Sequence, residues 1–472
     1  MSTLATIPLW LLVTLGIFSA LGLWLAVIAP LLTRLFYRRR QRSVRRLDQN
    51  LEFGLSPYAL ASRKLWLDRL LTDPEVVRVV ASIAEQSGQP LEVVQSRALQ
   101  DAQEIVPFFN LLLYFRIGYW LGRWVLRTMY WIRTSYDDAD ALADIDRDSC
   151  VVLVSNHRSN LDPFMLIYMA SRRSAVSYSA GEWALAWPFR YLLHAIGFYI
   201  LRREGGGDEL HRTLVQRYVF LAASHCMPQG LFLEGGLSRD GLMQPLKLGL
   251  LNYLVKARGH GSCRDIVFVP VGLSYDRIPE DRTLLAHQQQ GFRDKGRLYA
   301  SMSFARFAVL MMPRMIGLSK PFGTVVARFG RPISLARWEQ ETGNDVEKAE
   351  PGSRRTMVTS LGNTLRQEIQ RLIPILAISL LAEELLLAGQ QGVTELQIKH
   401  RALFLARRLQ AAGEPVILDP LTEDAEFSQA LYMILKRGIA ELGADGCLRA
   451  TAAGKSFLEY YRNAIPDTPG SD

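Results

Sequence analysis

The chain has 472 residues, and 49% of them are hydrophobic. At about 150 residues per domain this length suits two to four domains, and the apolar content excludes a disordered or collagen-like chain. The formal net charge is +9, but residues 34–46 hold seven arginines and no acidic residue, which leaves 48 basic and 46 acidic residues in the rest of the chain. Such a nearly neutral body argues against a nucleic-acid partner.

An apolar run extends from Leu4 to Leu32, and residues 1–33 contain no charged side chain. A helix needs about 20 such residues to cross the hydrocarbon core of a bilayer, whereas a signal peptide has a basic start and an apolar stretch of only about 7–15 residues. We therefore predict a single N-terminal transmembrane helix, with a buried core helix as the alternative. The arginines of 34–46 follow the run and predict, by the positive-inside rule, that the body of the chain lies on the cytoplasmic face of the membrane.

Two later segments combine apolar residues with arginines. Residues 106–132 are rich in aromatic side chains but include Arg116, Arg123 and Arg127, and residues 304–318 show a similar mixture. A spanning helix does not readily accept such charges, whereas a helix in the membrane interface places rings and guanidinium groups at headgroup depth. We expect interfacial helices here, and helices packed on the protein core are the alternative.

The pattern along the chain divides it into four regions. Residues 1–46 are the expected anchor, 47–135 are a helical region, and 345–472 are a linker, at 345–360, followed by a mainly helical C-terminal region that ends in a hairpin between Cys447 and Tyr461. Residues 136–344 alternate short apolar runs with helical stretches, which is typical of an α/β domain. The expected strands are 151–154, 231–233 and 266–271, and the expected helices are 163–172, 183–196, 209–226 and 246–258.

The four cysteines, Cys150, Cys226, Cys263 and Cys447, lie far apart in the sequence, with no C-x-x-C and no histidine at metal-ligand spacing. We expect reduced and mostly buried thiols, no metal site and no cofactor. Reduced thiols agree with a body that faces the cytosol.

A histidine and an aspartate follow the expected strand at 151–154. In the sequence Ser155-Asn156-His157-Arg158-Ser159-Asn160-Leu161-Asp162-Pro163, His157 stands just beyond the carboxyl end of the strand, where open α/β sheets hold their ligands. Asp162-Pro163 is typical of a helix N-cap with proline at the first helical position. A tight loop would bring the Asp162 carboxylate to the His157 ring, fix its tautomer and stabilise the imidazolium that forms on proton transfer. A plain helix cap with a solvated loop histidine is the alternative.

Two further stretches hold groups suited to phosphate. Arg202 and Arg203 follow an apolar run and match a forked clamp for an oxyanion, or else a solvated helix start. The other stretch continues the expected strand at 231–233 with Glu234, Gly235, Gly236, Ser238 and Arg239. Glycines let a backbone approach an anion closely, so this stretch predicts a phosphate cradle, with an ordinary turn as the alternative.

The order and spacing of these stretches resemble the glycerolipid acyltransferase family, most closely its membrane-bound glycerol-3-phosphate acyltransferase branch. His157 and Asp162 match that family's His-four-residues-Asp motif within Asn-His-Arg-Ser. The matches to its later blocks are Arg202-Arg203, Glu234-Gly235-Gly236 with Ser238-Arg239, Val269 to Asp276, and Phe329-Gly330-Arg331-Pro332-Ile333. The resemblance is specific over residues 145–335 and weaker on either side.

The resemblance implies a mixed-sheet α/β acyltransferase domain with flanking helices. It implies an O-acyltransferase that moves a fatty acyl group from acyl-CoA or acyl carrier protein to the hydroxyl of glycerol-3-phosphate, giving 1-acyl-glycerol-3-phosphate for phospholipid synthesis at a membrane whose lipids are its partners. His157 would be the general base, with Asp162 to orient it. The groups implied at the substrate are Arg202, Arg203, Glu234, Gly235, Gly236, Ser238, Arg239 and Lys247. Because the sequence has no G-x-S-x-G nucleophile elbow, we expect direct transfer without an acyl-enzyme.

Two positions depart from the pattern of this branch. Leu237 stands where the branch usually has an arginine before Ser-Arg, and Leu242 stands where another basic residue is common. Loss of a guanidinium from a phosphate site is not conservative, because arginine offers forked donors and a fixed charge. Either the remaining cations bind the phosphate, or the acceptor is a lysophospholipid or dihydroxyacetone phosphate. A membrane scaffold with an altered catalytic site is the alternative outside enzymes.

Overall fold

The computed structural model describes residues 62–108, 119–170, 176–181, 189–202, 208–290, 321–346 and 348–466. The predicted N-terminal span and the predicted interfacial segment at 304–318 lie outside these ranges, as do residues 109–118 of the other interfacial segment. In the described part of that segment, residues 119–129 form a helix that buries Leu126 and Met129 in the core, and a strand begins at Trp131, so this part follows the core-packed alternative and the interfacial prediction was wrong there. Among the described helices, none combines the length and the apolar character needed to cross a membrane.

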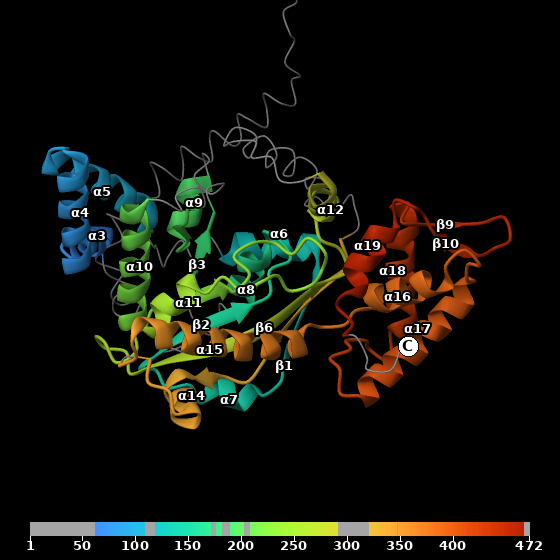
Figure 1. Cartoon of the computed structure of the whole chain (residues 1–472). Coiled ribbons are helices and arrows are strands. Elements are labelled where there is room, and N and C mark those ends of the chain that lie inside the picture. Colours follow the sequence, from blue (N-terminus) through green and yellow to red (C-terminus); the bar gives the residue numbers. More distant parts are fainter. Residues whose placement is uncertain are drawn as a thin grey trace, which may run out of the picture.

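A mixed β-sheet forms the centre of the molecule (Figure 1). Its described strands follow the order β1-β7-β6-β2-β5-β3-β4, and β8 pairs with β6. The strands are β1 Trp131–Tyr136, β2 Ser149–Ser155, β3 Ser177–Ala180, β4 Tyr199–Ile200, β5 Gln229–Phe232, β6 Asp265–Tyr275, β7 Thr324–Phe329 and β8 Ile333–Ser334. Strand β6 runs antiparallel to β7 and β8, and the other pairs are parallel. The predicted mixed α/β architecture is therefore confirmed.

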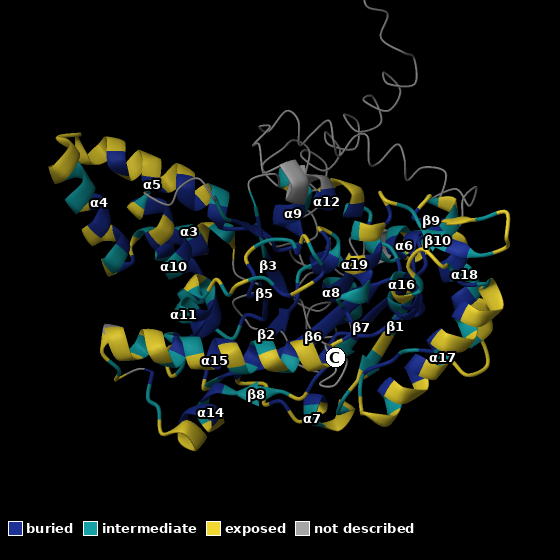
Figure 2. Cartoon of the chain, turned by 45° about the vertical axis from the view of Figure 1, so that its right-hand side comes forward, coloured by how far each residue is buried: buried dark blue, intermediate teal, exposed yellow. Residues whose placement is uncertain are grey.

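Both faces of the sheet are covered, because its central strands are apolar at consecutive positions. Strand β2 is buried along its whole length, as expected for a strand between two helical layers. Neighbouring side chains of a strand point to opposite faces. Val151 and Leu153 accordingly pack into one apolar cluster, and Val152 and Val154 pack into the other. Figure 2 shows buried strands inside a shell of helices whose outer faces are exposed.

Two groups of helices form these layers. The helices are α3 Arg63–Leu71, α4 Pro74–Ser87, α5 Leu91–Ile105, α6 Tyr119–Met129, α7 Ala139–Ala143, α8 Asp162–Ala170, α9 Phe189–Ala195, α10 Glu209–Ser224, α11 Gly249–Val255, α12 Asp281–Gln290, α14 Leu335–Thr342, α15 Pro351–Leu372, α16 Ala377–Ala388, α17 Glu395–Ala411, α18 Glu423–Lys436 and α19 Lys455–Arg462. Helices α3–α5, α10, α11 and α15 share the cluster of Val152. Helices α6, α8 and α16–α19 share the cluster of Leu153. In Figure 1, α3–α5 and α16–α19 lie at opposite ends of the sheet.

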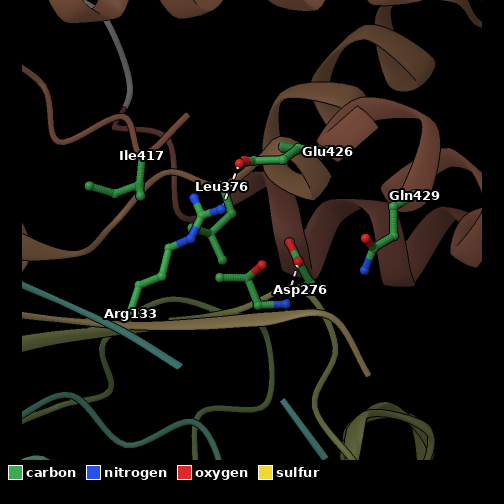
Figure 3. A pocket seen from close by; sticks show the side chains of 8 residues that line it. Arg133, Asp276, Leu376, Ile417, Glu426 and Gln429 are labelled. Carbon is green, nitrogen blue, oxygen red and sulfur yellow. Dashed lines mark hydrogen bonds and ion pairs between the residues drawn. The ribbon is translucent and has the colours of Figure 1, made fainter. Parts of the chain in front are cut away.

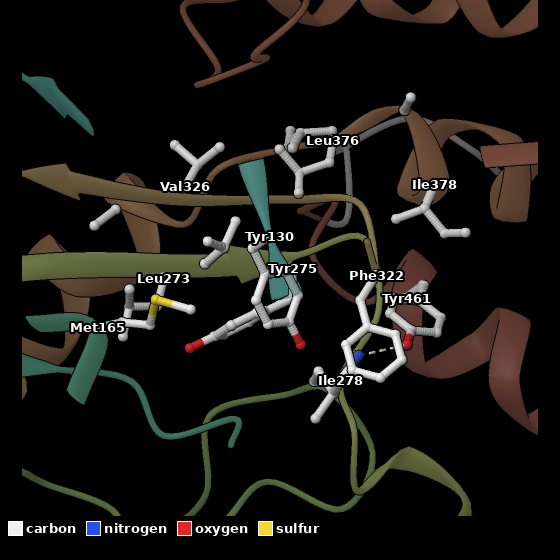
Figure 4. Close-up of a cluster of buried hydrophobic side chains, with 14 of the residues drawn as sticks. Tyr130, Met165, Leu273, Tyr275, Ile278, Phe322, Val326, Leu376, Ile378 and Tyr461 are labelled. Atoms are coloured by element: carbon white, nitrogen blue, oxygen red, sulfur yellow. Dashed lines mark hydrogen bonds between the residues drawn. The ribbon is translucent and has the colours of Figure 1, made fainter. Parts of the chain in front are cut away.

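The C-terminal helices are joined to the sheet by apolar and polar contacts. Figure 4 shows the Tyr461 ring of α19 beside Phe322 and Ile278, within the same cluster as Tyr130 and Tyr275. Figure 3 shows a small polar pocket at this junction, where Arg133 of β1 pairs with Glu426 of α18 at 2.8 Å. Because the two parts share one core, the C-terminal region is built onto the α/β domain.

Two local predictions were wrong. The polar stretch 345–360, which we interpreted as a linker, is helical from Pro351 onwards, and α15 packs against the sheet with Leu361 and Leu365 buried. The hairpin near the C-terminus consists of β9 Ala440–Leu442 and β10 Leu448–Ala450, so residues 455–461 form a helix and no strand. In both places, apolar residues at helical spacing pack against other parts of the fold, and the local sequence does not show which parts these are.

Candidate functional site

The site lies where β2 and β5 end. These neighbouring parallel strands pair in register, with Ser155 opposite Phe232. Carboxyl ends of parallel strands meet at one edge of a sheet, which is where open α/β sheets hold ligands. His157 lies two residues after Ser155, and Glu234 lies two residues after Phe232. The fold thus brings the first and third motif stretches side by side.

The predicted contact between the histidine and the aspartate is present. His157 Nδ1 lies 3.0 Å from Asp162 Oδ2, and the Asp162 side chain is fully buried while that of His157 is 14% exposed. A carboxylate can only accept hydrogen bonds, so Nδ1 carries the proton and Nε2 is left with a free lone pair. The imidazole is therefore held in the tautomer that a general base requires.

Asp162 is held by more than the histidine. Its Oδ2 also accepts hydrogen bonds from the backbone N–H groups of Arg158 (2.6 Å) and Ser159 (2.9 Å). Its Oδ1 accepts one from the hydroxyl of Tyr275 at 2.6 Å. The expected role as a helix N-cap was wrong, because α8 begins at Asp162 itself and the carboxylate turns back onto the preceding loop. Burial raises the pKa of Tyr275 well above its usual value, and the nearby Asp162 charge acts in the same direction, so Tyr275 remains a donor.

Glu234 and Phe232 hold His157 from the other side. The Glu234 carboxylate is buried and accepts hydrogen bonds from the backbone N–H groups of His157 (2.8 Å) and Gln244 (2.7 Å). Burial raises the pKa of Glu234, although these two hydrogen bonds act against that shift. The Phe232 ring stacks on the imidazole with centroids 4.0 Å apart. Glu234, which the resemblance implied at the substrate, positions the backbone of the histidine.

The loop after Glu234 is a tight turn with basic residues at its surface. Gly235 has a φ of +61°, and a Cβ there would lie 2.9 Å from Lys247 Cγ. The buried Ser238 hydroxyl is used within the turn, since it donates to the Leu242 carbonyl (2.7 Å). Gly236 is half-buried, whereas Arg239 and Lys247 are exposed. Their side chains make no ion pair with the described residues. The turn contacts the His157 loop through the Ser238 N–H, which donates to the His157 carbonyl at 2.8 Å, so Arg239 and Lys247 are candidates to meet a phosphate there.

The second motif stretch lies further along the same edge. Arg202 follows β4, which is separated from β2 by β5 and β3, or about 14 Å at the usual strand spacing. Its guanidinium forms ion pairs with Asp101 (3.2 Å) and Glu104 of α5. Arg203 lies outside the described residues. The strands bring Arg202 to the correct edge, and its charge is already paired with carboxylates.

Several residues of the site have no signal in the local sequence. Tyr275 lies in the Val269–Asp276 stretch, which matches a block of the resembling family but was given no role of its own at the site. Glu280 was not singled out, yet its carboxylate accepts hydrogen bonds from Ser159 Oγ (2.8 Å) and from Asn160. Both partners lie more than a hundred residues from the loop that they hold, so the local sequence gives no signal for either, and only Tyr275 lies within a stretch that matches a block of the resembling family.

The comparisons with known proteins agree with this geometry. A family model described as "Acyltransferase" matches residues 140–274, and one described as "Glycerol-3-phosphate acyltransferase C-terminal region" matches residues 314–466. A glycerol-3-phosphate acyltransferase of Pseudomonas entomophila is 26% identical over an alignment that covers 91% of this chain and 51% of the relative. A glycerol-3-phosphate acyltransferase of Colwellia psychrerythraea is 23% identical over an alignment that covers 87% of this chain and 50% of the relative. The chain thus spans about half the length of these curated relatives.

Among solved structures, the 1-acyl-sn-glycerophosphate (LPA) acyltransferase PlsC of Thermotoga maritima is 13% identical over 65% of this chain and 98% of that one. Its TM-score of 0.28 is too low to support an argument about this fold. The two family models instead span more than half of the chain, and the first contains the whole of the His157–Asp162 and Glu234 stretches. The chain belongs to the glycerolipid acyltransferase family, in its glycerol-3-phosphate acyltransferase branch.

Proposed function

We propose that this chain is an O-acyltransferase that transfers a fatty acyl group from a thioester to the hydroxyl of glycerol-3-phosphate. The observation that carries the proposal is the contact between His157 and a buried, fully hydrogen-bonded Asp162 at the carboxyl ends of β2 and β5. This arrangement leaves one ring nitrogen free to accept a proton. The names of the relatives and the second family model support the choice of acceptor.

The chemistry needs one general base and no covalent intermediate. Nε2 of His157 takes the proton of the acceptor hydroxyl as its oxygen attacks the thioester carbonyl. The new C–O bond forms, the C–S bond breaks, and the proton passes from His157 to the departing thiolate. Asp162 stabilises the imidazolium between these steps, because an opposite charge at hydrogen-bond distance favours the protonated ring.

The phosphate would bind near Arg239 and Lys247. Both cations are exposed beside the loop that contacts His157, whereas Arg202 is paired with acidic residues of α5. Leu237 stands in this loop at the place of a third cation. It favours, as a second candidate, a lysophospholipid acceptor, whose acyl chain adds apolar contacts that glycerol-3-phosphate lacks; dihydroxyacetone phosphate carries the same phosphate as glycerol-3-phosphate and is distinguished from it by the acceptor panel.

We infer that the reaction takes place at the cytoplasmic face of a membrane, with acyl-CoA or acyl carrier protein as donor. The apolar run at 1–33 and the arginines of 34–46 support this location. The acyl chain and the product both dissolve in lipid. Deletion of residues 1–33 should weaken membrane association only in part, and complete release would argue against membrane contacts by the segments 109–118 and 304–318.

An acceptor panel tests the proposed reaction. The full chain, purified into phospholipid vesicles, is incubated with labelled glycerol-3-phosphate, lysophosphatidate or dihydroxyacetone phosphate, each with acyl-CoA and with acyl carrier protein. We expect labelled 1-acyl-glycerol-3-phosphate as the main product. Transfer to lysophosphatidate alone would contradict the acceptor, and no transfer to any acceptor would contradict the enzyme assignment.

The His157→Ala variant assigns the activity to the described site. Loss of a general base costs about 10²- to 10⁴-fold in rate, so acyl transfer should fall by this factor with an unchanged thermal transition. His400 is exposed on α17, and His400→Ala is the matched control with unchanged activity. Full activity of purified His157→Ala would refute the mechanism.

A further inference from the structure

The loop that carries the catalytic pair, residues 156–162, is held by segments outside the sheet. Glu280 accepts hydrogen bonds from the side chain of Ser159 and from the backbone and side chain of Asn160. On the opposite side, the buried Arg158 donates to the Gly241 carbonyl at 2.7 Å. The position of the catalytic loop therefore depends on where Glu280 and Gly241 are placed.

The C-terminal helices place Glu280 through its neighbour. Asp281 is buried, and its Oδ2 pairs with Arg437, next to the end of α18, at 2.6 Å. The same oxygen accepts a hydrogen bond from the Tyr461 hydroxyl of α19 at 2.8 Å. That hydroxyl in turn accepts the backbone N–H of Ile278 at 3.2 Å, as Figure 4 shows. One tyrosine hydroxyl thus ties two positions of the 278–281 segment to α19.

The C-terminal helices also place Gly241. Asn463, which follows α19, donates from Nδ2 to the Asp240 carbonyl at 2.9 Å. Gly241 has a φ of +85°, and a Cβ there would lie 2.1 Å from the Tyr460 carbonyl oxygen. The Arg158 guanidinium lies over the Tyr460 ring, 5.7 Å from its centroid. The end of α19 therefore contacts the turn and the arginine that hold the catalytic loop on this side.

We propose that the C-terminal helical region positions the catalytic loop of the acyltransferase domain, with Tyr461 and Asn463 as positioning residues. The two contacts are independent, because one acts through Asp281 and Glu280 and the other through the 240–241 turn. Catalysis requires reacting groups held to a fraction of an ångström, so loosening either support should cost rate and leave substrate affinity unchanged. The effect on rate rests on the proposed function; the effect on loop position does not.

The test removes each contact with a small change. Tyr461→Phe deletes only the hydroxyl, and Asn463→Ala deletes only the donor to Asp240. Tyr432 is an exposed tyrosine of α18 whose hydroxyl accepts a hydrogen bond from Lys436 of the same helix, so Tyr432→Phe is the matched control for loss of a tyrosine hydroxyl. The full chain in vesicles is assayed for kcat and KM, and hydrogen–deuterium exchange is followed over 156–162 and 240–244, with β2 and β6 as internal references.

One hydrogen bond is worth about 1 kcal/mol, or about fivefold in rate. We therefore expect Asn463→Ala, which removes one bond, to lower kcat by about fivefold, and Tyr461→Phe, which removes two, to lower it by about 5- to 25-fold, with both KM values within twofold. Deuterium uptake should rise over 156–162, without a change in β2 or β6. A merely structural role would instead raise uptake in the strands too, or lower the folded fraction. Unchanged kcat and unchanged deuterium uptake of the loop in the Tyr461→Phe/Asn463→Ala double variant would overturn the inference. If the double variant shows no thermal unfolding transition because it does not fold, the same two measurements on the single variants decide.

The two proposals fail in different ways. If the parent chain has no activity with glycerol-3-phosphate or the other acceptors, the proposed function is wrong, while the exchange measurement still decides whether α19 holds the loop. If the parent is active and Tyr461→Phe, Asn463→Ala and Tyr432→Phe all match it in rate and exchange, the proposed function stands and the positioning role is wrong.

Discussion

Replacement of Asp162 by asparagine separates charge from geometry at the proposed catalytic pair, His157 and Asp162. Oδ2 accepts three hydrogen bonds, from His157 and from the N–H groups of Arg158 and Ser159, whereas Oδ1 faces one hydroxyl. An asparagine satisfies this pattern if its oxygen takes the Oδ2 position and its amide faces Tyr275, whose hydroxyl can turn to accept. The loop should therefore keep its conformation in Asp162→Asn, and the negative charge alone is lost.

The loss of that charge has a calculable size. Opposite charges 3.0 Å apart attract each other by about 5 kcal/mol at an effective dielectric constant of about 20. The neutral hydrogen bond to the amide oxygen that remains recovers about 1 kcal/mol, and the partial exposure of His157 screens the rest in part. We expect kcat to fall by about 10²- to 10³-fold, which corresponds to about 3–4 kcal/mol, with little change in KM or in the thermal transition.

The assay compares Asp162→Asn with Asp445→Asn, which removes the same charge from an ion pair with Arg449 on the distant hairpin turn. Initial rates of acyl transfer in vesicles give kcat and KM, and exchange over 156–162 checks the loop. A rate within threefold of the parent would refute the reasoning, because the imidazolium would then need no countercharge. Increased exchange of the loop would show that geometry, and not charge, was lost.

Three further changes probe the surroundings of the site. Tyr275→Phe removes the 2.6 Å hydrogen bond to Asp162, and kcat should fall about tenfold, as expected for a bond to a charged group; steady-state kinetics measure this. Burial raises the pKa of Asp276 in the pocket of Figure 3 from 3.8 to about 6, so the folded state binds this proton more tightly and loses stability as pH rises from about 4 to about 6. The free energy of unfolding of Asp276→Asn should then exceed that of the parent by up to about 3 kcal/mol at pH 7 and equal it near pH 4. Thermal unfolding of both proteins between about pH 4 and pH 7 measures this difference. Leu237→Arg adds a cation to the proposed phosphate loop and should lower KM for glycerol-3-phosphate several-fold in acceptor titrations; an unchanged KM would move the phosphate elsewhere.

The sequence predicted the parts of the site that are local. The apolar run at 151–154 and the loop that follows it indicate where the strand ends, and five residues of separation allow His157 to meet Asp162 in a tight turn. The same reasoning placed Glu234 beyond a second strand. These predictions succeed because parallel strands put their carboxyl ends at one edge of the sheet, and this rule does not depend on distant side chains.

The remaining contacts could not be predicted, because they join residues far apart in the chain. Tyr275 stands in an apolar strand like any core tyrosine, and only the folded register of β6 beside β2 brings its hydroxyl to Asp162. Arg202 matched a phosphate clamp by its neighbours, yet the acidic residues that pair with it lie on α5. At Pro351 a usable signal was present, since proline is favoured at the first position of a helix.

The hydrogen bonds to Asp162 explain how the loop can serve through a whole catalytic cycle. In the proposed mechanism, His157 gains a proton when the acceptor is activated and gives it up when the thiolate leaves, so its attraction to Asp162 changes at each step. The other bonds to Asp162 come from two backbone N–H groups and from Tyr275, whose raised pKa keeps its hydroxyl protonated. None of these donors changes charge during the reaction, so the carboxylate stays in place whichever form the imidazole has. A base positioned in this way needs no rearrangement of its partner between proton uptake and release, which is the preorganisation that lowers an activation barrier.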